Sequence, residues 1–199
     1  MSIVAGQEHR VEEHEATATK TLGFWIYLMT DCILFASLFA TYIVLREGTY
    51  GGPGGRELFE LPFVLLETII LLASSFTCGL SLLAARKGLV KPAIIGLGAT
   101  FVLGVIFLTL ELGEFLKLMG EGHSWQASAF LSAFFTLVGT HGLHIAVGLL
   151  WVLVMIIQLV RQGLTSGTIR RLGMFGLFWH FLDIIWIFIF TIVYLMGVI

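Results

Sequence analysis

Charged residues are scarce in this sequence, and their scarcity excludes an ordinary water-soluble domain. Lys, Arg, Asp and Glu make up 12% of the 199 residues, whereas about 25% is usual for a soluble domain. Hydrophobic residues make up 58%. The composition therefore predicts an integral membrane protein. The net charge of −2 gives no reason to expect a nucleic-acid partner.

Cysteine is also rare, and it lacks the spacing of a metal or redox motif. Cys32 and Cys78 both lie in apolar runs, and no CxxC or CxxCH motif occurs. Zinc ribbons, thioredoxin chemistry and c-type haem attachment therefore have no support. The first 21 residues lack the basic stretch of a cleavable signal peptide. We interpret residues 1–21 as a cytoplasmic N-terminal tail, solvated and largely disordered.

Five long apolar segments predict an all-α membrane protein with five transmembrane helices. Each segment exceeds the roughly 20 residues that a helix needs to cross the hydrocarbon core. Each is apolar on all sides, whereas barrel strands alternate over about 10 residues. We place the helices near 22–46, 61–85, 92–117, 126–160 and 173–198, within a single membrane domain over 22–199.

The distribution of Lys and Arg predicts the orientation of these helices, because cytoplasmic segments carry the excess of positive charge. With the N-terminus in the cytoplasm and the C-terminus in the periplasm, eight basic residues lie inside and three outside. The inner residues are Arg10, Lys20, Arg86, Lys87, Lys91, Arg161, Arg170 and Arg171, and the outer ones are Arg46, Arg56 and Lys117.

The last apolar segment contains ionisable and indole side chains, although an aspartate at a helix centre costs about 2.5–3.5 kcal/mol on insertion scales. Residues 179–186 read Trp-His-Phe-Leu-Asp-Ile-Ile-Trp. His180 and Asp183 share one helix face, and Trp179 and Trp186 flank that face. Such groups usually face a protein interior and mark a functional or assembly site.

Helix rise places the other polar residues of the spans at two depths. The inner-to-middle group contains Asp31, His180 and Asp183, with His141 and His144 near or just above it. The outer group contains Glu67, Glu111 and Glu114.

Three interpretations of the inner group remain open. His141, His144 and His180 could hold a metal, or a histidine pair across helices could hold a haem, but a fourth metal ligand is not evident. Paired Asp and His are also typical of proton relays. We favour a structural role, in which the buried groups pair across helices and fix the packing or a lipid headgroup. The residues indicate neither a catalytic site nor a convincing metal site.

Several motifs taken in order resemble subunit III of the haem–copper terminal oxidases, from Gly23 to Gly197. They are Thr30-Asp31-Cys32, Leu-Gly-Val-Ile-Phe at 103–107 leading to Glu114, His-Gly-Leu-His at 141–144, and the segment at 179–186. The quinol-oxidase branch of that family, the cytochrome bo type, is the most similar. Its resemblance is carried by residues 23–29, 59–65, 131–135 and 138–144, by the five spans, and by an aspartate at position 31.

The resemblance implies a subunit without catalytic residues, cofactors or metal of its own. Subunit I of such a complex carries the haems and copper, takes electrons from quinol, reduces oxygen to water and pumps protons. This chain would pack mainly against subunit I, with subunits II and IV in the complex, in the bacterial inner membrane of an aerobic respiratory chain. Its helices would form a V-shaped bundle whose cleft holds phospholipids, and it would support assembly, stability and sustained proton uptake.

The resemblance also implies roles for particular residues, namely helix-bundle hydrogen bonding, lipid contact and assembly. The residues that match the family pattern are Asp31, Glu114, His141, His144, His180 and Asp183. Glu67 and Glu111 are particular to the quinol branch and receive no role. The alternatives are subunit III of a cytochrome c oxidase or a free-standing proton or small-solute transporter. A transporter has little support, because no pair of Gly- or Pro-broken helices occurs in corresponding halves.

Overall fold

The computed structural model describes residues 2–198 and the side chains of residues 19–198. This part of the chain is helical and contains no strand. Its elements are α1 (Ser2–Leu45), α2 (Gly55–Leu58), α3 (Leu61–Arg86), α4 (Val90–Gly120), α5 (Ala129–Gln162), α6 (Ser166–Ile189), the π-helical segment η1 (Phe190–Leu195) and α7 (Met196–Val198).

Five helical segments are long and apolar enough to cross a membrane, which confirms the predicted all-α class and the number of spans. They are Thr19–Leu45, Leu61–Arg86, Val90–Gly120, Ala129–Gln162 and Ser166–Val198. Many large apolar side chains on these spans, such as Ile69, Phe76 and Ile95, are exposed. They therefore require lipid or another protein chain to cover them.

Two helices begin earlier than the sequence predicted. Helix α1 begins at Ser2 rather than near residue 22, which differs from the disordered tail expected there. Residues 2–21 contain no proline and several good helix formers, so nothing local stops the helix. Helix α6 begins at Ser166 rather than 173, because the Thr165 hydroxyl accepts a hydrogen bond from the backbone N–H of Thr168 (3.1 Å) and caps the helix.

The chain divides into two compact units, Met1–Ala36 and Ser37–Ile199. The first unit is the N-terminal part of α1. The single membrane domain over 22–199 and the V-shaped arrangement both concern how the two units sit together, so both stay predictions.

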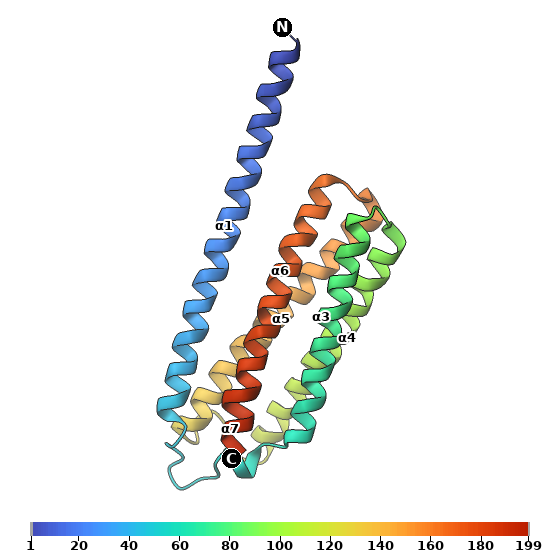
Figure 1. The fold of residues 1–199 in the computed structure, drawn as a ribbon. Coiled ribbons are helices and arrows are strands. Elements are labelled where there is room, and N and C mark those ends of the chain that lie inside the picture. The colour runs from blue at the N-terminus through green and yellow to red at the C-terminus, as the bar shows by residue number, and fades with distance from the viewer. Residues whose placement is uncertain (1, 199) are drawn as a thin grey trace. The chain divides into compact units, whose positions relative to one another are not determined.

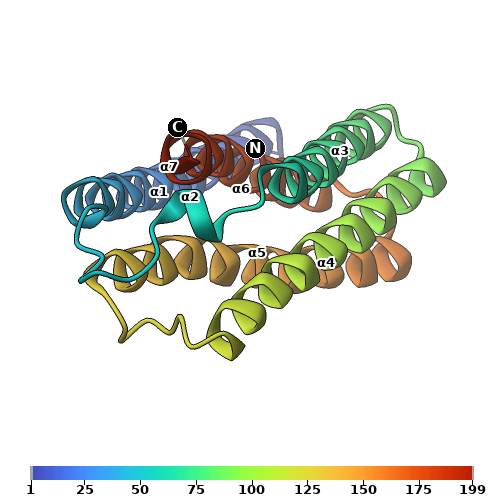
Figure 2. The same ribbon diagram turned by 90° about the horizontal axis from the view of Figure 1, so that it is seen from below.

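Four long helices of the second unit form a closed bundle. Helix α3 packs against α4 and α6, and α5 packs against the same two helices. Figure 1 shows the α3–α4 and α5–α6 connections at one end of this bundle. Figure 2 shows α2 and the C-terminal α7 close together at the opposite end, where the two helices are in contact.

Helices α3 and α4 approach each other closely where a glycine leaves room. A Cβ on Gly96 would lie 2.8 Å from the Cβ of Ser81, which is too close for two carbon atoms. The Ser81 hydroxyl donates a hydrogen bond to the carbonyl of Ala93 (2.7 Å) at the same crossing. Small residues and a short polar contact therefore hold these helices together, as is common in membrane bundles.

The π-helical segment η1 interrupts the last span near its end and was not predicted. A π-helix shifts the backbone hydrogen bonds from i→i+4 to i→i+5. Here the Tyr42 hydroxyl donates a hydrogen bond to the carbonyl of Val193 (3.4 Å). The wider turn also places Tyr194 in the interior of the unit, where its side chain is fully buried.

Candidate functional site

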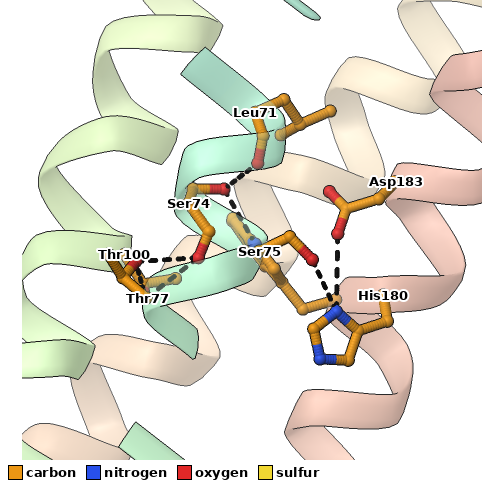
Figure 3. Close-up of polar contacts among 8 residues, drawn as sticks. Leu71, Ser74, Ser75, Thr77, Thr100, His180 and Asp183 are labelled. Carbon is orange, nitrogen blue, oxygen red and sulfur yellow. Dashed lines mark hydrogen bonds and ion pairs between the residues drawn. The ribbon is translucent and has the colours of Figure 1, made fainter. Parts of the chain in front are cut away.

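The His180–Asp183 pair joins α6 to α3 rather than standing alone. The Ser75 hydroxyl of α3 shares a hydrogen bond of 2.6 Å with Nδ1 of His180, and Oδ2 of Asp183 lies 3.6 Å from the same nitrogen. Figure 3 shows His180 and Asp183 on one side of Ser75. The Asp183 side chain is 7% exposed and that of His180 is 43% exposed. The aspartate therefore lies inside the unit, while the imidazole reaches its surface.

A second polar contact joins α3 to α4 beside the first. The hydroxyls of Thr77 and Thr100 lie 2.9 Å apart, and the Thr100 hydroxyl also donates to the carbonyl of Ser74 (3.3 Å) (Figure 3). Because Ser74 and Ser75 are adjacent, one turn of α3 bonds to α4 on one side and to α6 on the other. This turn links three helices.

The two indoles of the 179–186 segment point into the bundle and are almost completely buried. Nε1 of Trp179 donates a hydrogen bond to the Ser74 hydroxyl (3.1 Å), and Nε1 of Trp186 donates to the Thr68 hydroxyl (3.0 Å). Both hydroxyls belong to α3. Each tryptophan thus buries a large ring and satisfies its single polar atom, as buried indoles require.

Two glycines form the space that holds the Trp179 ring. A Cβ on Gly104 of α4 would lie 3.0 Å from Cη2 of this ring, and a Cβ on Gly148 of α5 would lie 2.8 Å from Cζ3. The indole therefore packs against the backbones of both helices. The contacts of both tryptophans are packing contacts and hydrogen bonds within the bundle.

The three glutamates of the predicted outer group lie near enough to interact, with Glu67 on α3 and the other two on α4. Glu111 interacts electrostatically with both Glu67 and Glu114. The Tyr194 hydroxyl donates a hydrogen bond to Oε2 of Glu114 (3.1 Å). Glu67 and Glu111 are buried to 0% and 1% exposure, whereas Glu114 is half-buried.

A cavity of about 460 Å³ lies beside this group, at the end of α3 and α4. Its lining includes Glu57, Glu60, Leu110, Glu114 and Lys117. Nζ of Lys117 lies 2.8 Å from Oε1 of Glu60, and this hydrogen bond, with the charge of the ammonium, lowers the pKa of Glu60. The cavity thus has an ion pair near its surface and a half-buried carboxyl in its wall.

The three histidines considered as metal ligands have different neighbours. His141 is fully buried, stacks on Trp186 with ring centroids 5.3 Å apart, and meets the edge of Phe107 at 6.2 Å. Nδ1 of His144 lies 2.7 Å from the carbonyl of Thr140 in its own helix. Among residues 19–198, no three His, Cys, Asp or Glu side chains lie close enough to hold a metal ion. The residues described do not assemble the histidine trio.

The depth estimate placed His141 near or just above the level of His180 and Asp183. Gly142, the next residue, packs against the carboxyl group of Glu111. His141 is therefore level with the glutamates. The estimate used helix rise alone, whereas packing sets the relative level of residues on neighbouring helices.

Asp31 belongs to the first unit, so its relation to His180 and Asp183 stays a prediction. Within α1 it accepts a hydrogen bond from Tyr27, one turn earlier. This bond partly satisfies the aspartate inside its own helix.

Sequence reasoning missed most of the partners of these residues. Ser74, Ser75 and Tyr194 were not among the predicted site residues. Thr68 and Thr100 were not singled out. The available signal was the repeated Ser and Thr along one apolar helix, since a hydroxyl in a membrane span often bonds across helices.

Comparison with known proteins shows what this chain resembles. Residues 6–198 match the family described as cytochrome c oxidase subunit III. A protein of Pseudomonas aeruginosa named cytochrome bo(3) ubiquinol oxidase subunit 3 is 55% identical over 96% of this chain and 91% of its own length. A protein of the same name from Pseudomonas putida is 50% identical over 93% of this chain and 89% of its own. The cytochrome c oxidase subunit 3 of Bacillus sp. (strain PS3) is 46% identical over 90% of this chain and 87% of its own.

Proposed function

We propose that this chain, which belongs to the cytochrome c oxidase subunit III family, is the non-catalytic subunit III of a proton-pumping ubiquinol oxidase of the aerobic respiratory chain. The chain is a multi-pass membrane protein and a terminal oxidase subunit III. The assignment to a ubiquinol oxidase rests on the 55% identity, over 96% of the chain, to a relative named as a ubiquinol oxidase subunit.

The contacts of the polar residues support a subunit that carries no redox centre. Ser75 bonds the ring of His180, and the ring of His141 is packed between two aromatic side chains. The hydroxyls of Thr68, Ser74, Ser75 and Thr100 and the indoles of Trp179 and Trp186 thus join helices of the second unit. Their proposed role is assembly and stability, consistent with the structural interpretation made from the sequence.

The proposed partners are subunit I mainly, with subunits II and IV, and phospholipids. The exposed apolar side chains of every span support this, because they need lipid or protein to cover them. The proposed place is the bacterial inner membrane, with the N-terminus in the cytoplasm. In the complex, haems and copper belong to subunit I, and this chain supports sustained proton uptake there.

A cytochrome c oxidase is the second candidate, because the Bacillus relative at 46% identity carries that name. Purification of the complex through a tag on this chain separates the two. We expect the purified complex to oxidise ubiquinol and not reduced cytochrome c. Oxidation of cytochrome c in place of ubiquinol would refute the quinol assignment.

The same preparation tests the non-catalytic role. We expect the chain purified alone to show no haem absorption. Asp31→Asn and His180→Ala should reduce the yield or durability of the complex more than its initial rate of oxygen reduction. Loss of the first turnovers in an intact complex with its full haem content would refute the proposed role.

A further inference from the structure

Two buried glutamates of the second unit have no hydrogen-bond partner among the described residues. Glu67 of α3 is 0% exposed and Glu111 of α4 is 1% exposed. Among the described residues, none makes a hydrogen bond to any of the four carboxyl oxygens of this pair. We call Glu67 and Glu111 the carboxyl dyad. Since a buried polar group without a partner is costly, something other than a side chain must satisfy the dyad.

In the described part of the chain, no positive charge acts on the dyad. Helix α4 contributes Glu114, and Lys117 is paired with Glu60. Helix α5 contributes His141, packed between aromatic rings, and His144, which bonds to its own helix. The segment η1 contributes Tyr194, whose hydroxyl is bonded to Glu114. The charged groups that act on the dyad, among the residues described, are therefore carboxylates.

The backbone of α5 lies against the carboxyl group of Glu111. A Cβ on Gly142 would lie 2.9 Å from Oε1 and 3.0 Å from Oε2 of Glu111. A methyl group at this position would displace the end of the Glu111 side chain. The carboxyl group of Glu111 thus lies directly against the backbone of α5.

An ionised pair in this place would be very unfavourable. A charged carboxylate without hydrogen bonds or a counter-ion loses its hydration on burial, and the usual response is to become neutral. Two neighbouring carboxylates also repel each other, so that one of them retains a proton. Burial and mutual repulsion therefore favour the binding of a proton by the dyad.

Glu114 connects the dyad to the cavity. It lies one helical turn after Glu111, on the same face of α4. It is half-buried and forms part of the cavity wall. A proton could thus pass from the cavity to Glu114 and then to Glu111 by transfer between carboxyl oxygens and water.

We propose that Glu67 and Glu111 form a proton-binding dyad, which holds at least one proton at neutral pH and exchanges it with the cavity through Glu114. The ligand is a proton, accompanied by ordered water at the free carboxyl oxygens. This inference does not depend on which reductant the complex uses.

Infrared spectroscopy of the purified oxidase complex tests the dyad, because a protonated carboxyl group has a C=O stretch that shifts on deuteration. We expect a protonated-carboxyl band at neutral pH in the unchanged complex. It should persist in Glu57→Gln, which alters an exposed glutamate of the same cavity. It should disappear in the Glu67→Gln, Glu111→Gln double variant. An unchanged band in the double variant would overturn the proposal.

The single variants decide the matter if the double variant does not assemble. Each of Glu67→Gln and Glu111→Gln should change the position or intensity of the band, and no change in either would refute the dyad. Carboxylate bands that shift when sodium replaces potassium would show a bound cation and would also refute it.

Glu114→Gln tests the route to the cavity. This variant should keep the dyad band but slow its hydrogen–deuterium exchange at least several-fold. Exchange as fast as in the unchanged complex would show that the proton does not pass through Glu114.

Discussion

Gly148→Ala should destabilise this subunit because the added methyl group meets the Trp179 ring. The new Cβ would lie 2.8 Å from Cζ3 and 3.1 Å from Cε3 of the indole, where carbon atoms normally rest about 3.5–4.0 Å apart. The ring cannot easily retreat, because Nε1 is bonded to Ser74 and Gly104 of α4 closes the space near Cη2.

The magnitude follows from two opposing effects. Overpacking a well-packed core costs about 1–3 kcal/mol. Replacing a helical glycine with alanine stabilises the helix by about 1 kcal/mol through its higher helix propensity. Because the indole is held on several sides, we expect a net loss of about 1–2 kcal/mol.

Gly139→Ala provides a matched control in the same helix. Its Cβ would lie 3.6 Å from the nearest side-chain atom, Cε2 of Phe115, which is an ordinary contact. The control gains the same helix propensity without a clash, so it should be neutral or slightly stabilising.

The assay is the temperature at which half of the subunit has dissociated from the purified complex. Gly148→Ala should lower this temperature relative to Gly139→Ala. Trp179→Phe has a smaller ring, so in that background the effect of Gly148→Ala should shrink towards that of the control. Equal temperatures for the two alanine variants would refute the packing argument.

Three further predictions concern hydrogen bonds and charge. Ser75→Ala should lower the stability of the subunit by about 0.5–1.5 kcal/mol, because it removes the 2.6 Å hydrogen bond to His180. The same dissociation assay should detect this loss. Ser75→Thr keeps a hydroxyl and should lower the stability less. Tyr194→Phe should cost about 1 kcal/mol, since its hydroxyl donates to a half-buried glutamate, and an unchanged dissociation temperature would contradict this. The hydrogen bond from Lys117 and the charge of its ammonium lower the pKa of Glu60. The ion pair therefore stabilises the folded subunit fully above pH 4.5, the ordinary glutamate pKa. This stabilisation is lost as the pH falls through the lowered pKa of Glu60. Glu60→Gln should therefore flatten the acid side of the stability profile, and a profile identical to that of the unchanged protein would contradict it.

The sequence was sufficient for the number and approximate place of the spans. Hydropathy is a local property, so runs such as 61–85 and 92–117 identify their helices without any knowledge of their neighbours. The ends were less predictable. The hydroxyl of Thr165 caps the last span, which therefore begins at Ser166 rather than near 173. The π-helical segment before Met196 was not predicted from the sequence.

The sequence also indicated which polar residues matter, but not what they contact. His180 and Asp183 stood out because charged groups are rare in lipid. Their partner Ser75 did not, because a serine is common in a membrane helix. Tyr194 was not among the predicted site residues, yet it is buried beside Glu114.

What the sequence determined by itself is the class of protein, its five spans and the family to which it belongs, because composition, hydropathy and ordered motifs are properties of the chain alone. Tertiary structure decided how each helix is rotated and how the levels of its residues match those of its neighbours. Those two quantities depend on close packing at positions such as Gly104, Gly142 and Gly148, where an added methyl group would collide with another helix. They place Trp179 in the centre of the bundle and bring the carboxyl group of Glu111 against bare backbone.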